Sequence, residues 1–151
     1  MVSVTEKEDK IEVSTPYIES LPLKFRNMGG KWDSIKKVWV FKKEDKERVE
    51  AFLSKFFGFD INSKRVAAIV TARERVSAER ACVSFKGFVL AQAWGRDSGA
   101  RVGEGVALVS GDIDSSGSVK NWYSAIEKGA VFSIENFPSV FEENEKFEVK
   151  F

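Results

Sequence analysis

The chain contains no histidine among its 151 residues and only one cysteine, Cys82. Histidine is the commonest general base and the commonest metal ligand in proteins. Its absence excludes Ser-His-Asp triads, Cys-His dyads and histidine-based zinc sites. A lone cysteine excludes an internal disulfide and a cysteine-rich zinc site, and it suits a reducing compartment. Cys82 stands between Ala81 and Val83, so we expect a buried, inert thiol.

The chain also lacks a strong net charge, because 24 basic residues face 23 acidic ones and leave a formal charge of +1. No global field therefore draws it to nucleic acid or to an anionic membrane, and any such binding must use local patches. The first ten residues are polar and mixed in charge, unlike a signal peptide, and no apolar run is long enough to span a bilayer. We expect a cytoplasmic protein whose residues 1–9 form a flexible N-terminus.

What the sequence has in quantity is aromatic residues, with 13 Phe and 4 Trp in a chain that is 43% hydrophobic and 31% charged. These proportions are typical of a globular protein, and the length permits one medium domain or two small ones. We predict an α+β protein. Residues 10–58 should form a small β-α-β-β-α module, residues 59–63 a linker, and residues 64–151 a β-rich domain of barrel or sandwich type.

The first module is predicted from its hydrophobic spacing. Residues 11–15 alternate as a strand and stop at Pro16. A helix follows, because four apolar residues recur at spacings of three, four and three: Ile18, Leu21, Phe25 and Met28. Gly29 and Gly30 end it. A second apolar stripe predicts a helix that ends at Gly58 and contains Val49, Phe52, Leu53, Phe56 and Phe57.

Between these helices, residues 31–33 and 37–41 should form a hairpin around the turn 34–36. The residues that form a recognisable pattern in and before this hairpin are Phe25, Gly29, Gly30, Lys31, Trp32, Asp33, Lys37, Trp39 and Phe41. This pattern resembles the hairpins of HARP-type modules in fork-remodelling annealing helicases, and similar hairpins occur in small phage and plasmid proteins. The resemblance covers about a third of the chain and implies a role in DNA substrate recognition. The chain carries no helicase motor, so only that recognition role could transfer.

Charge in the same region points independently to nucleic acid. Asp33 is the only acid between residues 24 and 43, against seven basic residues: Lys24, Arg26, Lys31, Lys36, Lys37, Lys42 and Lys43. Amines neutralise phosphates, and exposed rings of Trp32 and Trp39 would stack on unpaired bases. Two alternatives remain open. At least one tryptophan could belong to the core, and the lysines could be a solvated face that protects the hairpin edge from pairing.

The second half contains many short apolar runs separated by glycine-rich turns, which favours a small barrel or sandwich, with one short helix at 121–128. Two polar loops, 95–103 and 111–122, could cradle a phosphate with five residues: Arg96, Ser98, Arg101, Ser118 and Lys120. Ordinary turns are the alternative, and neither P-loop nor EF-hand spacing is present. This half also resembles the companion domain of the same phage and plasmid proteins around residues 95–98 and 116–121, which implies no activity.

The leading hypothesis is a non-enzymatic accessory protein of phage or plasmid type that binds single-stranded or forked DNA. One alternative is a protein-binding module or inhibitor that acts on a host factor. Another is a nucleotide or small-anion binder that uses the glycine-rich loops. We expect no cofactor, no metal and no membrane partner, and the sequence does not predict an oligomeric state.

Overall fold

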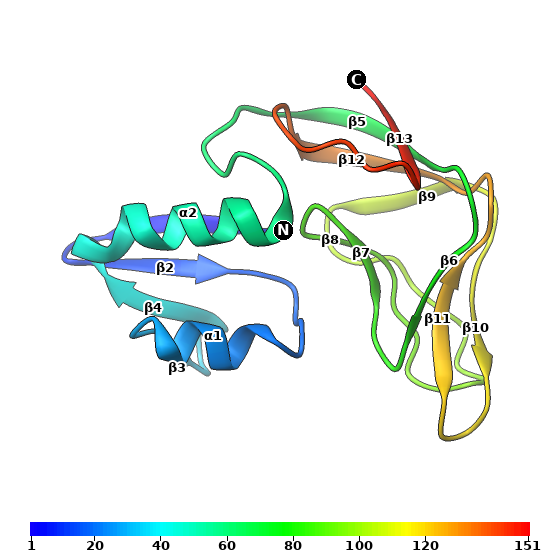
Figure 1. The fold of residues 1–151 in the computed structure, drawn as a ribbon, viewed down its shortest axis with the longest axis horizontal. Coiled ribbons are helices and arrows are strands. Elements are labelled where there is room, and N and C mark those ends of the chain that lie inside the picture. The colour runs from blue at the N-terminus through cyan, green and yellow to red at the C-terminus, as the bar shows by residue number, and fades with distance from the viewer.

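The computed structural model describes all 151 residues and shows an α+β protein dominated by antiparallel sheets. Its buried apolar side chains form two clusters, one from Val2 to Phe59 and one from Ala68 to Phe147. In Figure 1 the two halves lie side by side, and the N-terminus lies at their junction. No helix has the length and apolar character needed to cross a membrane.

The N-terminal half is built on one sheet of four antiparallel strands. In spatial order they are β1 (Ser3–Lys7), β2 (Lys10–Ser14), β4 (Val38–Lys42) and β3 (Lys31–Asp33). The helices are α1 (Leu21–Asn27) and α2 (Lys46–Phe57), which a 3-10 turn, η1 (Lys43–Asp45), precedes. The order along the chain is therefore β-β-α-β-β-α, one strand more than the sequence predicted.

That additional strand corrects the prediction of a flexible N-terminus at residues 1–9. Strand β1 pairs with β2 along its whole length through a two-residue turn, Glu8-Asp9. Val2 is buried in the core and Val4 packs against it. Alternating valines supply the apolar face that a half-buried strand needs, and this face outweighs the mixed charge of the segment.

Both helices cover the same face of this sheet. The side chains that meet there are Leu21 and Phe25 from α1, Val49, Leu53 and Phe57 from α2, and Ile11, Val13, Trp39 and Phe41 from the strands. Gly30 lies so close beneath Phe41 that a Cβ atom there would stand 2.7 Å from its ring. The close approach of α1 to the hairpin therefore depends on glycine at this position.

The second half folds around a core rich in phenylalanine. One sheet contains, in spatial order, β13 (Phe147–Lys150), β5 (Arg65–Ala72), β12 (Val131–Pro138) and β9 (Val106–Ser110). A second contains β10 (Ile113–Gly117), β11 (Trp122–Ile126) and β6 (Val76–Glu79), and a hairpin pairs β7 (Val83–Phe85) with β8 (Phe88–Ala91).

The predicted helix at 121–128 is wrong, because residues 122–126 form strand β11 between β10 and β6. The segment is too short for a stable isolated helix, and Trp122, Tyr123 and Ile126 are residue types that favour strands. Pairing on both sides then satisfies its backbone hydrogen bonds.

The predicted linker, 59–63, holds the two halves together. Phe59 is buried, pairs with Phe141 across a β-bridge, and lies under the Arg65 guanidinium, whose carbon is 4.9 Å from the ring centroid. Arg65 also donates a hydrogen bond to the Val2 carbonyl at 2.9 Å. Phe141 packs against both cores. The halves are therefore joined by buried contacts as well as by the chain.

Candidate nucleic-acid interface

The register of the hairpin decides where its side chains project. Trp32 lies directly opposite Trp39, while Lys31 lies opposite Val40. Opposed residues share a face and successive residues alternate. Both tryptophans therefore project to the face that the helices cover, Trp32 from the edge strand β3 and Trp39 from the central strand β4. Lys31 projects to the other face, which the helices leave open.

This alternation separates the basic residues that the sequence groups together. Lys31 and Lys42 lie on the open face, Lys36 and Lys37 in the turn, and the others on helical segments: Lys24 and Arg26 on α1, and Lys43 in η1. Lys36 Nζ donates to Glu12 Oε2 at 3.1 Å, and this contact raises the pKa of Lys36. Lys43 lies 3.8 Å from Glu6. The predicted residues do not form one basic track.

The two tryptophans differ in exposure. Trp39 is 7% exposed, and its ring lies 5.4 Å from the rings of both Phe25 and Trp32. The guanidinium carbon of Arg26 is 5.6 Å from the Trp39 centroid. Trp32 is 48% exposed. One tryptophan is thus core, and Trp32 is the one tryptophan of the hairpin with free ring surface.

Trp32 lines the first of two adjoining hollows. The first, of about 80 Å³, lies between the hairpin and α1 and is also lined by Tyr17, Ile18 and Pro22. The second, of about 780 Å³, lies between the two halves and is lined by Tyr17, Ile18, Arg80 and Trp94 among others. Because Tyr17 and Ile18 line both, the hollows adjoin at these two residues.

Three aromatic side chains are exposed along these hollows. Trp32 is 48% exposed, Tyr17 is 77% exposed and Trp94 is 63% exposed. We call Trp32, Tyr17 and Trp94 the aromatic track. It begins at the hairpin edge and crosses to the second half of the protein. The sequence pattern did not identify Tyr17, although this residue follows Pro16 in a connecting segment, and such segments run over the protein surface.

The first glycine-rich loop holds Trp94 in place. The Ser98 hydroxyl accepts a hydrogen bond from the Trp94 N–H at 2.9 Å, and the buried Ser124 hydroxyl accepts one from the Ala93 N–H at 2.9 Å. The Gly99 N–H donates to the Ser115 hydroxyl, also at 2.9 Å. These bonds fix the backbone on both sides of the exposed indole, so the loop supports the aromatic track.

The same bonds argue against a phosphate nest in the glycine-rich loops. The Ser98 and Gly99 N–H groups donate within the protein, and Ser118 and Asn121 close a turn on each other. Residues 113–117 of the second predicted loop form strand β10. The basic residues predicted in these loops lie apart. Arg96 forms an ion pair with Asp97 at 3.0 Å, and the backbone of Arg101 forms an isolated β-bridge with Gln92. Lys120 is exposed in the β10–β11 turn.

The larger hollow offers polar groups beside its rings. Arg80 is exposed at its edge, and Ser20, Ser84 and Gln92 line it. Cys82 also lines it and is half-buried, more accessible than we expected. Desolvation raises the pKa of the Cys82 thiol, so its reactive thiolate form is disfavoured. These groups suit recognition of a planar ring with polar edges better than nucleophilic attack.

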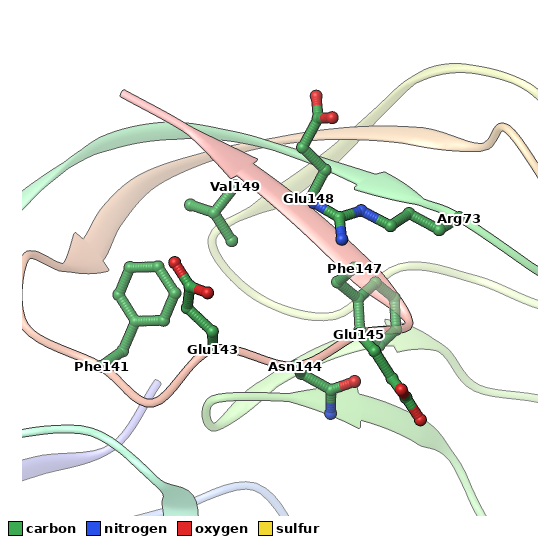
Figure 2. A pocket seen from close by; sticks show the side chains of 8 residues that line it. All are labelled: Arg73, Phe141, Glu143, Asn144, Glu145, Phe147, Glu148 and Val149. Atoms are coloured by element: carbon green, nitrogen blue, oxygen red, sulfur yellow. The ribbon is translucent and has the colours of Figure 1, made fainter.

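A separate hollow of about 290 Å³ lies beside β13 and is lined by acidic residues and Arg73. Figure 2 shows that the carboxylates of Glu143, Glu145 and Glu148 point in different directions. No group of three or more Cys, Asp or Glu side chains in the protein gathers as metal ligands would. This acidic hollow does not suit a polyanion, and we assign it no ligand.

Comparison with known proteins adds no further constraint: no family model, no curated protein and no solved structure matches this chain.

Proposed function

We propose that this protein binds single-stranded or forked nucleic acid, with unpaired bases stacked along the aromatic track, and that it acts by binding rather than by catalysis. The observation that carries the proposal is the exposure of Trp32, Tyr17 and Trp94 along two adjoining hollows. Exposed rings that gather along adjoining hollows indicate a binding surface, whereas single exposed apolar residues need no explanation.

This surface suits a single strand for three reasons. Aromatic rings stack on any base, and each such contact is worth about 1–3 kcal/mol. Gln92, Ser84 and Ser20 line the larger hollow and offer hydrogen-bonding groups to the edges of a splayed base. Arg80, which lines the larger hollow together with Trp94, supplies positive charge for a phosphate there, and Arg26 supplies a second cation near the Trp39 ring.

A binding role also agrees with the chemistry of the hollow. Its only thiol, that of Cys82, has a raised pKa, and the hollow contains no histidine that could activate it. Glu19 is its only carboxylate. A nucleophile and a base in contact, which covalent catalysis requires, are not among the lining residues.

The test is fluorescence anisotropy with a labelled single strand at about 50 mM and 200 mM salt, where phosphate contacts make affinity fall steeply as salt rises. Trp94→Ala should weaken binding by about 1–3 kcal/mol, or roughly 5- to 150-fold, and Trp32→Ala should act in the same direction. The matched control is Phe151→Ala, which removes an exposed aromatic residue that lines neither hollow.

Two results would contradict the proposal. One is the absence of binding by the unaltered protein at the lower salt concentration. The other is equal affinity of the Trp94→Ala and Phe151→Ala variants. Competition by a nucleoside monophosphate at concentrations that match the strand on a per-base basis would instead identify a free-nucleotide site, because a strand that spans several rings should bind far more tightly than one base.

A further inference from the structure

The open face of the N-terminal sheet carries a row of three lysines. Lys7 lies directly opposite Lys10 on β1 and β2, and Lys10 lies directly opposite Lys42 on β2 and β4. Opposed residues share a face, and neighbouring strands are about 4.8 Å apart. We call Lys7, Lys10 and Lys42 the lysine row. The sequence pattern assigned the first of these residues to a flexible tail, and so the row was missed.

The lysine row has no acidic partner on its own face. None of its three amines forms an ion pair. The acids of this face are engaged elsewhere, because Glu12 binds Lys36 at 3.1 Å and Asp33 accepts the N–H groups of Lys36 and Ile35. Those backbone bonds, above all that of Lys36, lower the pKa of Asp33 and hold it in the turn. Lys31 extends the positive face by one row.

This arrangement has a cost that the fold does not require. Like charges directly opposed on neighbouring strands destabilise a sheet. No open-face residue of the four strands is buried, so packing does not demand lysine at these positions. An external polyanion would neutralise the row.

We propose that the lysine row binds the sugar-phosphate backbone of duplex nucleic acid, so that the protein recognises a junction between duplex and single strand. The inference rests on the proposed function, in which the single strand follows the aromatic track at the covered side of the same sheet. A duplex is the occupant that fits, because it presents dense negative charge without unstacked bases. The open-face strand residues include no aromatic ring, only lysines, two valines, small hydroxyl residues and the two engaged acids.

The experiment compares three labelled substrates: a single strand, a blunt duplex and a fork. The row variant is Lys7→Gln, Lys10→Gln and Lys42→Gln combined. Its matched control removes the same charge from three exposed lysines of other segments, Lys55→Gln, Lys64→Gln and Lys128→Gln. The row variant should lose roughly tenfold or more in affinity for fork and duplex. The slope of the logarithm of its binding constant against the logarithm of the salt concentration should become shallower by about 0.9 for each lost phosphate contact.

The single strand is the internal control, and its affinity for the row variant should stay within twofold of that for the unaltered protein. Folding is not at risk, since removing opposed like charges should leave the melting temperature unchanged or raised. If the row variant and the control triple bind the fork with equal affinity, and likewise the duplex, the inference is overturned. An equal loss on all three substrates would also overturn it, because that result would indicate one general phosphate surface.

Failure of the proposed function gives a different result. If the single strand does not bind but duplex binding depends on the row, the aromatic track is lost as a site and the duplex surface is supported. A membrane is the competing occupant of a basic face. If the row variant loses binding to vesicles of anionic lipid while its fork affinity is unchanged, the duplex assignment is overturned.

Discussion

The two faces of the N-terminal sheet contrast sharply. On the covered face, Ile11, Val13, Phe41 and Trp39 are buried beneath both helices. On the open face no residue of the four strands is buried, and lysines stand directly opposite one another. The same strands supply both sets of side chains by alternation. One sheet thus carries a face that specifies the fold and a face that is free to carry charge.

The contrast shows that the effect of a substitution on the covered face depends on packing, whereas its effect on the open face depends on contacts with solvent or a bound partner. On the covered face a change of volume disturbs many neighbours, because interiors are close-packed. On the open face the same change meets solvent. Substitutions at adjacent positions of one strand therefore separate the two faces, since neighbours along a strand point in opposite directions.

The largest difference is expected at two adjacent residues of β4. Phe41→Ala should lower the free energy of unfolding by about 3–5 kcal/mol, because Phe41 is buried against Phe25 and Gly30. Val40→Ala, on the open face, should cost about 1 kcal/mol or less. Urea denaturation followed by circular dichroism measures both. Equal losses would show that the open face is covered in solution.

A smaller effect is expected at the two glycines that follow α1. A Cβ at Gly30 would stand 2.7 Å from the Phe41 ring and 2.9 Å from the Phe25 carbonyl oxygen, so Gly30→Ala should cost about 1–3 kcal/mol through overpacking. Gly29 has open space around it but a φ of +88°, so Gly29→Ala should cost about 1 kcal/mol through backbone strain.

The matched change at Gly29 is asparagine, which tolerates the left-handed region better than alanine does. Gly29→Asn should therefore unfold at a higher denaturant concentration than Gly29→Ala, while Gly30→Asn should be at least as unstable as Gly30→Ala. If asparagine rescues Gly30 and not Gly29, the roles of the two glycines are reversed.

Those parts of the N-terminal half whose hydrophobic spacing repeats were predictable from the sequence. Leu21 and Phe25 of the three-four-three stripe lie on α1, although Ile18 and Met28 flank that helix. The stripe around Val49 and Leu53 lies on α2, whose C-cap is Gly58 with a φ of +73°. The hairpin strands appear at 31–33 and 38–42, close to the predicted ranges. Local periodicity and turn residues determine these elements, so a single sequence reveals them.

The errors lie where tertiary pairing decides. Strand β1 is short and charged, and it becomes a strand because β2 offers it a partner. Residues 122–126 pair on both sides, which no local pattern records. The phosphate loops stay a prediction, but Ser98 and Ser115 accept hydrogen bonds from the backbone of the first glycine-rich loop, a use of its N–H groups that composition does not reveal. Composition alone does not show which hydrogen bonds a fold completes.

The candidate site was only partly foreseeable for the same reason. Trp32 and Trp39 both stand among basic residues in the sequence. Only Trp32 keeps free surface, because β4 is central in the sheet and β3 is its edge strand. Tyr17 and Trp94 are distant in the sequence and line one hollow only after the halves meet. The lysine row depends on the register of three strands.

The smallest expected effect concerns that row and has the opposite sign to the others. Lys10→Glu replaces the central amine with a carboxylate between Lys7 and Lys42, and two repulsive pairs become attractive. Unfolding should therefore become harder by about 0.2–1 kcal/mol at low salt. The gain should shrink as salt screens the charges. The control is Lys24→Glu, the same charge change on α1, which should give no such gain. A loss of stability on Lys10→Glu would mean that the lysine amines point apart and do not repel one another. The open face would then be a solvated surface, with no charge repulsion for a bound polyanion to relieve.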